Sequence, residues 1–154
     1  MVSPKYETRG TFTVAGLKYR GGNENDEVSQ LWDSYGERMD EIHALAITDE
    51  AFGVCYEHDH DNGTFSYIAG VAVGSDREIP AEMDTVSVPE QTYAVFTATL
   101  DSLGETIDTI YDQWFPASEY RRADGPEFER YGREFDSDSP DSEFEYFVPV
   151  ASGT

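Results

Sequence analysis

The chain has 154 residues, which fits a single domain, and it carries 32 Asp and Glu against 10 Lys and Arg. Aromatic residues make up 14% of the sequence, more than a disordered acidic chain would hold, so we expect it to fold. No basic stripe is available to neutralise phosphates, which argues against direct binding of nucleic acid. No apolar run is long enough to span a membrane and no leader is recognisable, so we expect a cytoplasmic protein without a membrane partner.

The excess of negative charge is spread along the whole chain rather than gathered in one tail, and Lys5 and Lys18 are the only lysines. This pattern is typical of adaptation to molar salt, and we favour that interpretation over an acidic surface for a basic partner. At about 1 M salt the screening length is only about 3 Å, so exposed carboxylates cannot select a ligand from a distance. Only a carboxylate removed from water could do so.

In the first half, residues 8–20 alternate as a β-strand, and a break follows before a helix that Asn25 or Asp26 could cap. Apolar residues at spacings of three and four predict one helix with a single apolar stripe, made of Val28, Leu31, Trp32, Tyr35, Met39 and Ile42. Residues 51–57 and 65–73 then predict a β-hairpin, with Asn62-Gly63 as its turn signal.

From residue 84 the pattern begins again. A strand is predicted through Thr99, and Ser102 with Glu105 has the spacing of a capping box. A second helix should follow and end at Pro116, with an apolar stripe formed by Leu103, Ile107, Ile110, Tyr111 and Trp114. Residues 128–135 and 144–150 predict a closing hairpin.

The two halves are related in sequence. An offset of 79 positions superposes the two helical stripes and places residues 65–67 on residues 144–146. We therefore predict one α+β domain over residues 1–154, built from duplicated βαββ halves (approximately 6–80 and 81–154) with pseudo-twofold symmetry. Two such halves should share an antiparallel sheet backed by two main helices, with an aromatic-lined ligand cleft at the seam.

Most reactive side chains fit structural roles. His58 and His60 flank Asp59, but no third ligand is apparent and the segment runs into the hairpin turn, so we expect no metal and no cofactor. Cys55 lies in an apolar stretch and reads as a packed hydrophobe rather than a nucleophile. Motifs of the common nucleophilic hydrolases, kinases and zinc proteases are missing.

Glu145 differs from the other acidic residues because it lies in an apolar strand segment. Its neighbours Phe144, Tyr146 and Phe147 make the strand apolar on both faces, as is usual for a central strand. A carboxylate there must be paired, protonated or directed into a cavity.

Several motifs identify a family. The sequence resembles the GyrI-like small-molecule-binding family, which includes the effector-binding domains of AraC-type and multidrug-responsive regulators. The resemblance covers essentially the whole chain and rests on Trp114-Phe115-Pro116 with Ser118, Gly125-Pro126, Phe128-Glu129-X-Tyr131, residues 144–150, residues 93–96, residues 65–67 and Gly70-Val71.

The resemblance implies a cleft between duplicated halves, with an aromatic pocket and an acidic residue that attracts lipophilic cations. By position, Glu145 matches the glutamate before the family's final strand motif, and Glu129 with Tyr131 matches its Glu-X-Tyr. No DNA-binding helix-turn-helix is recognisable, so we expect a stand-alone domain rather than a complete regulator.

The leading hypothesis is a domain that binds small, lipophilic, aromatic cations. Glu145 would be desolvated with a raised pKa, and Tyr131 would donate a hydrogen bond to it. Glu129 would assist, and rings for stacking and cation–π contact would come from Tyr67, Tyr93, Trp114, Phe147 and Trp32.

Two alternatives share this fold. In the first, Glu145 and Tyr131 act as the catalytic pair of a hydrolase that detoxifies electrophilic compounds. In the second, suggested only by family membership, the protein modulates DNA gyrase. Fold alone does not decide among the three.

Overall fold

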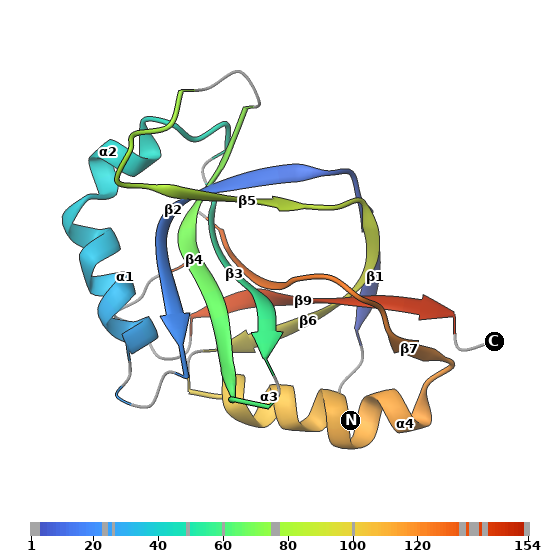
Figure 1. The fold of residues 1–154 in the computed structure, drawn as a ribbon. Coiled ribbons are helices and arrows are strands. Elements are labelled where there is room, and N and C mark those ends of the chain that lie inside the picture. Colours follow the sequence, from blue (N-terminus) through green and yellow to red (C-terminus); the bar gives the residue numbers. More distant parts are fainter. Residues whose placement is uncertain are drawn as a thin grey trace.

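The computed structural model describes residues 4–22, 25, 27–48, 50–59, 61–74, 78–99, 101–132, 135, 139 and 142–152. Within these residues, nine antiparallel strands form one sheet and a few helices lie outside it, which makes a mixed α+β fold (Figure 1). The strands are β1 (Lys5–Arg9), β2 (Phe12–Gly21), β3 (Ala51–Asp59), β4 (Thr64–Val73), β5 (Asp84–Val88), β6 (Gln91–Thr99), β7 (Tyr120–Arg122), β8 (Glu127–Tyr131) and β9 (Glu143–Ser152). The helical segments are α1 (Glu27–Glu37), α2 (Met39–His43), α3 (Leu103–Thr109), η1 (Ile110–Trp114) and α4 (Phe115–Ala117).

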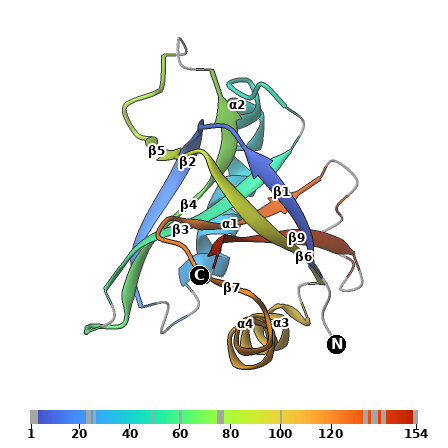
Figure 2. The same cartoon turned by 90° about the vertical axis from the view of Figure 1, so that its right-hand side faces the viewer.

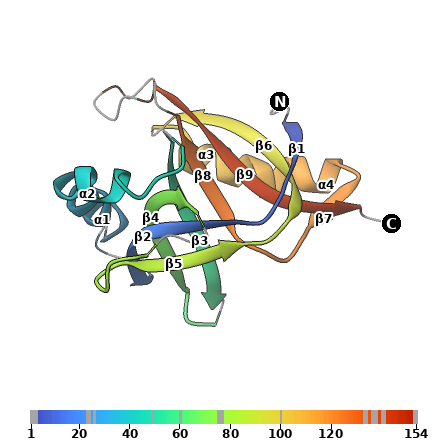
Figure 3. The same cartoon turned by 90° about the horizontal axis from the view of Figure 1, so that it is seen from above.

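The sheet curls round on itself. Its order is β1-β6-β9-β8-β3-β4-β2-β5, with β7 on β9, and the two outermost strands continue directly into inner ones, β1 into β2 and β5 into β6. Arg9 pairs with Gln91 and Phe12 pairs with Val88, so one register runs through both pairings. Both ends of the sheet therefore meet in one bent two-stranded ribbon, which Figures 2 and 3 show from the side and from above.

Three apolar clusters follow from this curl. The inner face of the sheet is filled by one cluster that includes Phe52, Tyr93, Phe128 and Phe147. On the outer face, one cluster lies under α1 and a second lies under α3 and η1. The strands between these two outer clusters are β3 and β8, which pair from Ala51–Tyr131 to Cys55–Glu127.

The first predicted helix is divided. A break at Arg38 separates α1 from α2, and Arg38 has a non-helical conformation (φ −115°, ψ 15°). Gly36, a poor helix former, lies just before the break. The change of direction buries Ile42 but leaves Met39 45% exposed, so the predicted single stripe is wrong at Met39.

The second predicted helix contains a π-helical segment. In η1 the N–H of Phe115 donates to the carbonyl of Ile110, five residues earlier. A new short helix, α4, then carries Pro116 in its first turn, where a missing N–H costs nothing, so the helix continues to Ala117 instead of ending at the proline. The predicted capping box is also wrong, because Ser102 Oγ accepts from the N–H of Thr99 at 3.0 Å and makes no cap.

The hairpin of β3 and β4 is confirmed. Gly63 takes the left-handed conformation (φ 68°) that the turn requires, and its N–H donates to the carbonyl of Asp59 at 2.8 Å. The strands β8 and β9 also pair, Phe128 with Phe147 and Arg130 with Glu145.

The sequence predicted no metal site and no membrane span, and the structure bears on both within the described residues. His60 and the side chain of His58 lie outside these residues; elsewhere in the described chain no group of three or more His, Cys, Asp or Glu could hold a metal ion. No helix among the described residues is long and apolar enough to cross a membrane.

Candidate functional site

The carboxylates of Glu127 and Glu129 lie on the outer face of the sheet, between the helical segments. Among the strands, the backbone of α1 lies mainly along β2 and β4, and that of α3 lies along β6. The two helices are at different sides of the sheet (Figure 1), and β3 and β8 lie between these strands in the sheet order. The alternation of β8 directs Glu127, Glu129 and Tyr131 to this outer face, and Phe128 and Arg130 to the inner one. The sequence Glu-Phe-Glu-Arg-Tyr thus brings two acids and a phenol to the boundary between the two outer clusters.

Glu129 is held by two tyrosines. Its Oε1 accepts hydrogen bonds from the hydroxyl of Tyr67 at 2.7 Å and from that of Tyr131 at 2.8 Å. The indole N–H of Trp32 on α1 in turn donates to the Tyr67 oxygen at 3.0 Å. Glu129 keeps some accessible surface even though protein surrounds its carboxyl group.

Aromatic rings enclose this carboxyl group. The ring of Trp32 lies edge-on to Tyr131, with centroids 5.3 Å apart, and edge-on to Tyr67 at 6.4 Å. On its other side, Tyr131 packs against Phe144 at 4.7 Å. The carboxyl group of Glu129 therefore lies among aromatic rings, which can stack on an aromatic ligand or make a cation–π contact.

The setting of Glu129 changes its acidity. Burial raises the pKa of Glu129, and the two tyrosine hydrogen bonds oppose only part of that rise. Burial, and then the nearby carboxylate, raises the pKa values of Tyr67 and Tyr131, so both phenols remain hydrogen-bond donors at neutral pH. The cost of ionising Glu129 would fall if a cation were bound beside it.

Glu127 has a different environment, although it too accepts two tyrosine hydroxyls, those of Tyr111 and Tyr146. An arginine also pairs with it, because Arg122 Nε lies 3.0 Å from Glu127 Oε2. Arg122 comes from β7, and residues 123–126 bulge between β7 and β8 where both run along β9. Only 8% of Glu127 is exposed.

The floor of the site is made by β3. Gly53 pairs with Glu129, and a Cβ at this position would overlap the hydroxyl of Tyr67 and lie 2.6 Å from Glu129 Oε1. Cys55 lies opposite Glu127 in the same register. Burial, and then the two carboxylates, raises the pKa of the Cys55 thiol to about 12, so it is not an activated nucleophile.

Comparison with known proteins places the chain in a family. Residues 6–150 match the family described as Cass2, the integron-associated effector binding protein. The chain belongs to this family. It is also 30% identical over 145 residues to the transcriptional regulator BrlR of Pseudomonas aeruginosa, a match that covers 92% of this chain and about half (53%) of the regulator.

Solved structures show the same fold. The structure of SAV2435 bound to tetraphenylphosphonium matches with a TM-score of 0.78 and 18% identity, over 97% of this chain and 94% of that one. The integron cassette protein VCH_CASS2 of Vibrio cholerae matches with a TM-score of 0.67 and 20% identity, over 97% of both chains. This Cass2-family chain is thus an effector-binding domain related to the ligand-binding domains of regulators, and it is similar to the GyrI-like effector domains that its motifs resemble.

In this Cass2-family domain, four of the predicted site residues come together: Trp32, Tyr67, Glu129 and Tyr131. Tyr93 and Phe147 pack on the opposite, inner face of the sheet against Phe128, with ring centroids 5.2 and 4.4 Å from it. Trp114 packs against Phe96 in the cluster under the second group of helices.

The prediction of a raised pKa for Glu145 is wrong. Glu145 pairs with Arg130 in the register of β8 and β9, so its side chain lies on the inner face, away from Glu129. It forms ion pairs with Arg130 and with Lys5, the latter at 2.6 Å. Although partial burial acts to raise its pKa, these two cations together lower it. Tyr131 donates to Glu129 instead of Glu145, so the predicted Glu145–Tyr131 pair is not formed.

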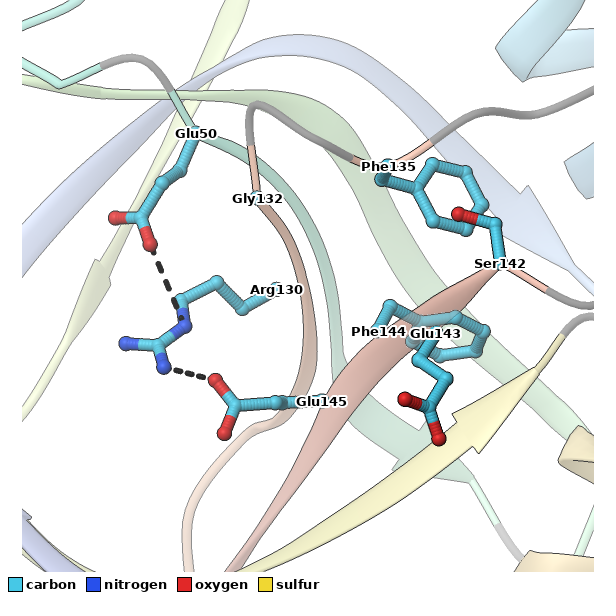
Figure 4. Close-up of a pocket in the computed structure, with 8 residues that line it drawn as sticks. All are labelled: Glu50, Arg130, Gly132, Phe135, Ser142, Glu143, Phe144 and Glu145. Carbon is cyan, nitrogen blue, oxygen red and sulfur yellow. Dashed lines mark hydrogen bonds and ion pairs between the residues drawn. The ribbon is translucent and has the colours of Figure 1, made fainter.

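Glu145 does line a pocket of about 460 Å³ at the end of β8 (Figure 4). Arg130 lies there between the carboxylates of Glu50 and Glu145, while the rings of Phe135 and Phe144 lie toward the other side. The ring of Tyr131 packs against both phenylalanines. Tyr131 therefore contacts two residues that line one side of this pocket, and it also contacts Glu129.

Sequence reasoning did not assign Glu127, Tyr111, Tyr146, Arg122 or Gly53 to the site. The alternation of residues 127–131 was a usable signal for Glu127, because it lies on the same strand face as Glu129. Nothing local marked Gly53, whose importance depends on the register of β3 with β8 and on a tyrosine from β4.

Proposed function

We propose that this domain binds small lipophilic cations with aromatic groups, and that Glu129 is the acidic residue that recognises their charge. The observation that carries the proposal is a carboxyl group enclosed by Trp32, Tyr67 and Tyr131, with which no Lys, Arg or His among the described residues forms an ion pair. Its raised pKa marks the carboxylate as one that a bound cation would stabilise.

Membership of the effector-binding family supports this proposal, and so does the fold shared with SAV2435, whose structure holds the lipophilic cation tetraphenylphosphonium. Each ring that contacts a desolvated cation would contribute about 0.5–2 kcal/mol. Because Tyr131 packs against the walls of the pocket at the end of β8, we further propose that ligands enter there and displace its ring.

We also propose that the site lies at the seam of a duplicated fold. The first residues of β2 and β6 are 79 positions apart, and so are those of β4 and β9, which is the offset that relates the two halves in sequence. The seam between such halves is the pair β3 and β8, which carries Gly53 and Glu129.

Isothermal titration with tetraphenylphosphonium tests the function, using triphenylphosphine oxide as a neutral aromatic comparison. We expect saturable binding of the cation in 1 M KCl, a loss of about tenfold or more in Glu129→Gln, and little change for the neutral compound. Glu145→Gln is the matched control, and we expect it to bind the cation as the wild type does. If cation binding depends on Glu145 and not on Glu129, Glu145 is the residue that recognises the charge. If the wild type does not bind the cation at all, the proposal is rejected.

A further inference from the structure

The two carboxylates of β8 form nearly matched arrangements. Glu127 and Glu129 alternate on one strand face, so their backbones are about 6–7 Å apart. Each accepts two tyrosine hydroxyls, Glu129 from Tyr67 and Tyr131, and Glu127 from residues 111 and 146. Two acids at this spacing would suit a ligand with two positive charges.

Arg122 makes the environment of Glu127 different from that of Glu129. Its guanidinium pairs with Glu127 and also donates to the carbonyl of Gly125 at 3.0 Å and to that of Ala123. It lies 3.2 Å from the Tyr111 oxygen as well, so four acceptors surround it. Since the bulge at residues 123–126 provides two of these acceptors, the backbone fixes the guanidinium beside Glu127.

We propose that Arg122 makes this site selective for singly charged cations by neutralising Glu127. The inference rests on the proposed function, in which Glu129 binds a cation. With Glu127 already paired, the site offers one uncompensated negative charge. A dication would have to displace Arg122 from its four acceptors, or would leave its own second charge unpaired in a desolvated place, and both are costly.

The test compares two ligands of similar shape, the monocation 1-benzyl-4-(4-benzylphenyl)pyridinium and the dication 1,1′-dibenzyl-4,4′-bipyridinium. We expect the wild type to prefer the monocation, and Arg122→Gln to move the affinity ratio toward the dication by about tenfold or more. The double variant Arg122→Gln/Glu127→Gln removes both charges and should restore the monocation preference. Arg122→Lys keeps the charge but loses the planar fork, and it should keep the wild-type ratio if charge rather than support of the bulge is what matters.

Glu127→Gln gives an independent readout should Arg122→Gln fail to fold. It leaves the guanidinium uncompensated, so both ligands should bind more weakly, and the dication more so. An affinity ratio that stays the same in Arg122→Gln, or in Glu127→Gln, would overturn the inference, and so would a ratio that changes equally in Arg122→Lys. If the inference about Arg122 is overturned but Glu129→Gln still abolishes monocation binding, the proposed function remains supported. If the wild type binds neither ligand, the inference and the proposed function are both rejected.

Discussion

The hydroxyl of Tyr67 on β4 donates to Glu129 on β8 over 2.7 Å, although these strands do not pair. Strand β3 lies between them, and the hydrogen bond passes over Gly53. The contact exists because β3 has no side chain at this point, so a phenol from one neighbouring strand can reach a carboxylate on the other.

Replacing this glycine should therefore damage the site. In Gly53→Ala the new Cβ would overlap the Tyr67 hydroxyl, and the buried Glu129 would lose a donor, so we expect the free energy of unfolding to fall by about 1–3 kcal/mol. Urea denaturation at pH 7 measures this. Gly132→Ala is the control, since a Cβ there has no atom within 4 Å. Equal midpoints for the two variants would show that the space over Gly53 is not needed.

The raised pKa of Glu129 predicts a particular dependence of stability on pH. The folded state holds this proton more tightly than the unfolded chain does, so the free energy of unfolding should fall as pH rises from about 4.3 through the raised folded value. Glu129→Gln removes that loss and keeps an oxygen for both tyrosines, so it should be at least as stable as the wild type at pH 7. Denaturation between pH 4 and pH 8 at constant salt tests this, and an unchanged pH slope in the variant would contradict it.

Glu145 should behave in the opposite way. Its lowered pKa means that its ion pairs stabilise the fold above the unfolded value of about 4.3, and that this contribution is lost as pH falls through the lowered folded value. Because the pair is partly exposed, Glu145→Gln should cost about 1 kcal/mol or less at pH 7. Glu143→Gln, at the exposed position two residues before it, is the matched control and should cost less. A variant as stable as wild type at pH 7 would mean that Arg130 gains nothing from this partner.

Cys55 should resist alkylation while the protein is folded. Its pKa of about 12 leaves very little thiolate at pH 8, even though the residue is partly accessible. Mass spectrometry after exposure to iodoacetamide should find slow labelling in buffer and rapid labelling in denaturing urea. Equal rates under both conditions would show that the thiol is not held in a desolvated position.

Local patterns predicted much of the fold. The hairpin of β3 and β4 was found because an Asn-Gly pair and an alternating strand are signals that a few neighbouring residues carry by themselves. The helices were placed correctly but not their interruptions at Arg38 and Ile110. Such breaks are decided by how each helix packs on the sheet, and a repeating apolar pattern does not record them.

The sequence by itself determined part of the composition of the site: Glu129 and Tyr131 on one predicted strand, Tyr67 on another and Trp32 on the first helix. It could not decide which acid is paired. Glu145, which the sequence favoured, meets Arg130 and Lys5 because the register of β8 with β9 and the fold of β1 onto β6 bring them there. Glu129 accepts hydrogen bonds from two phenols and forms no ion pair with a described Lys, Arg or His, because the alternation along β8 directs it to the other face. The face of the sheet on which each glutamate lies decides its partners and therefore its pKa. That face depends on strand pairings between residues far apart in the chain, which only the tertiary structure sets.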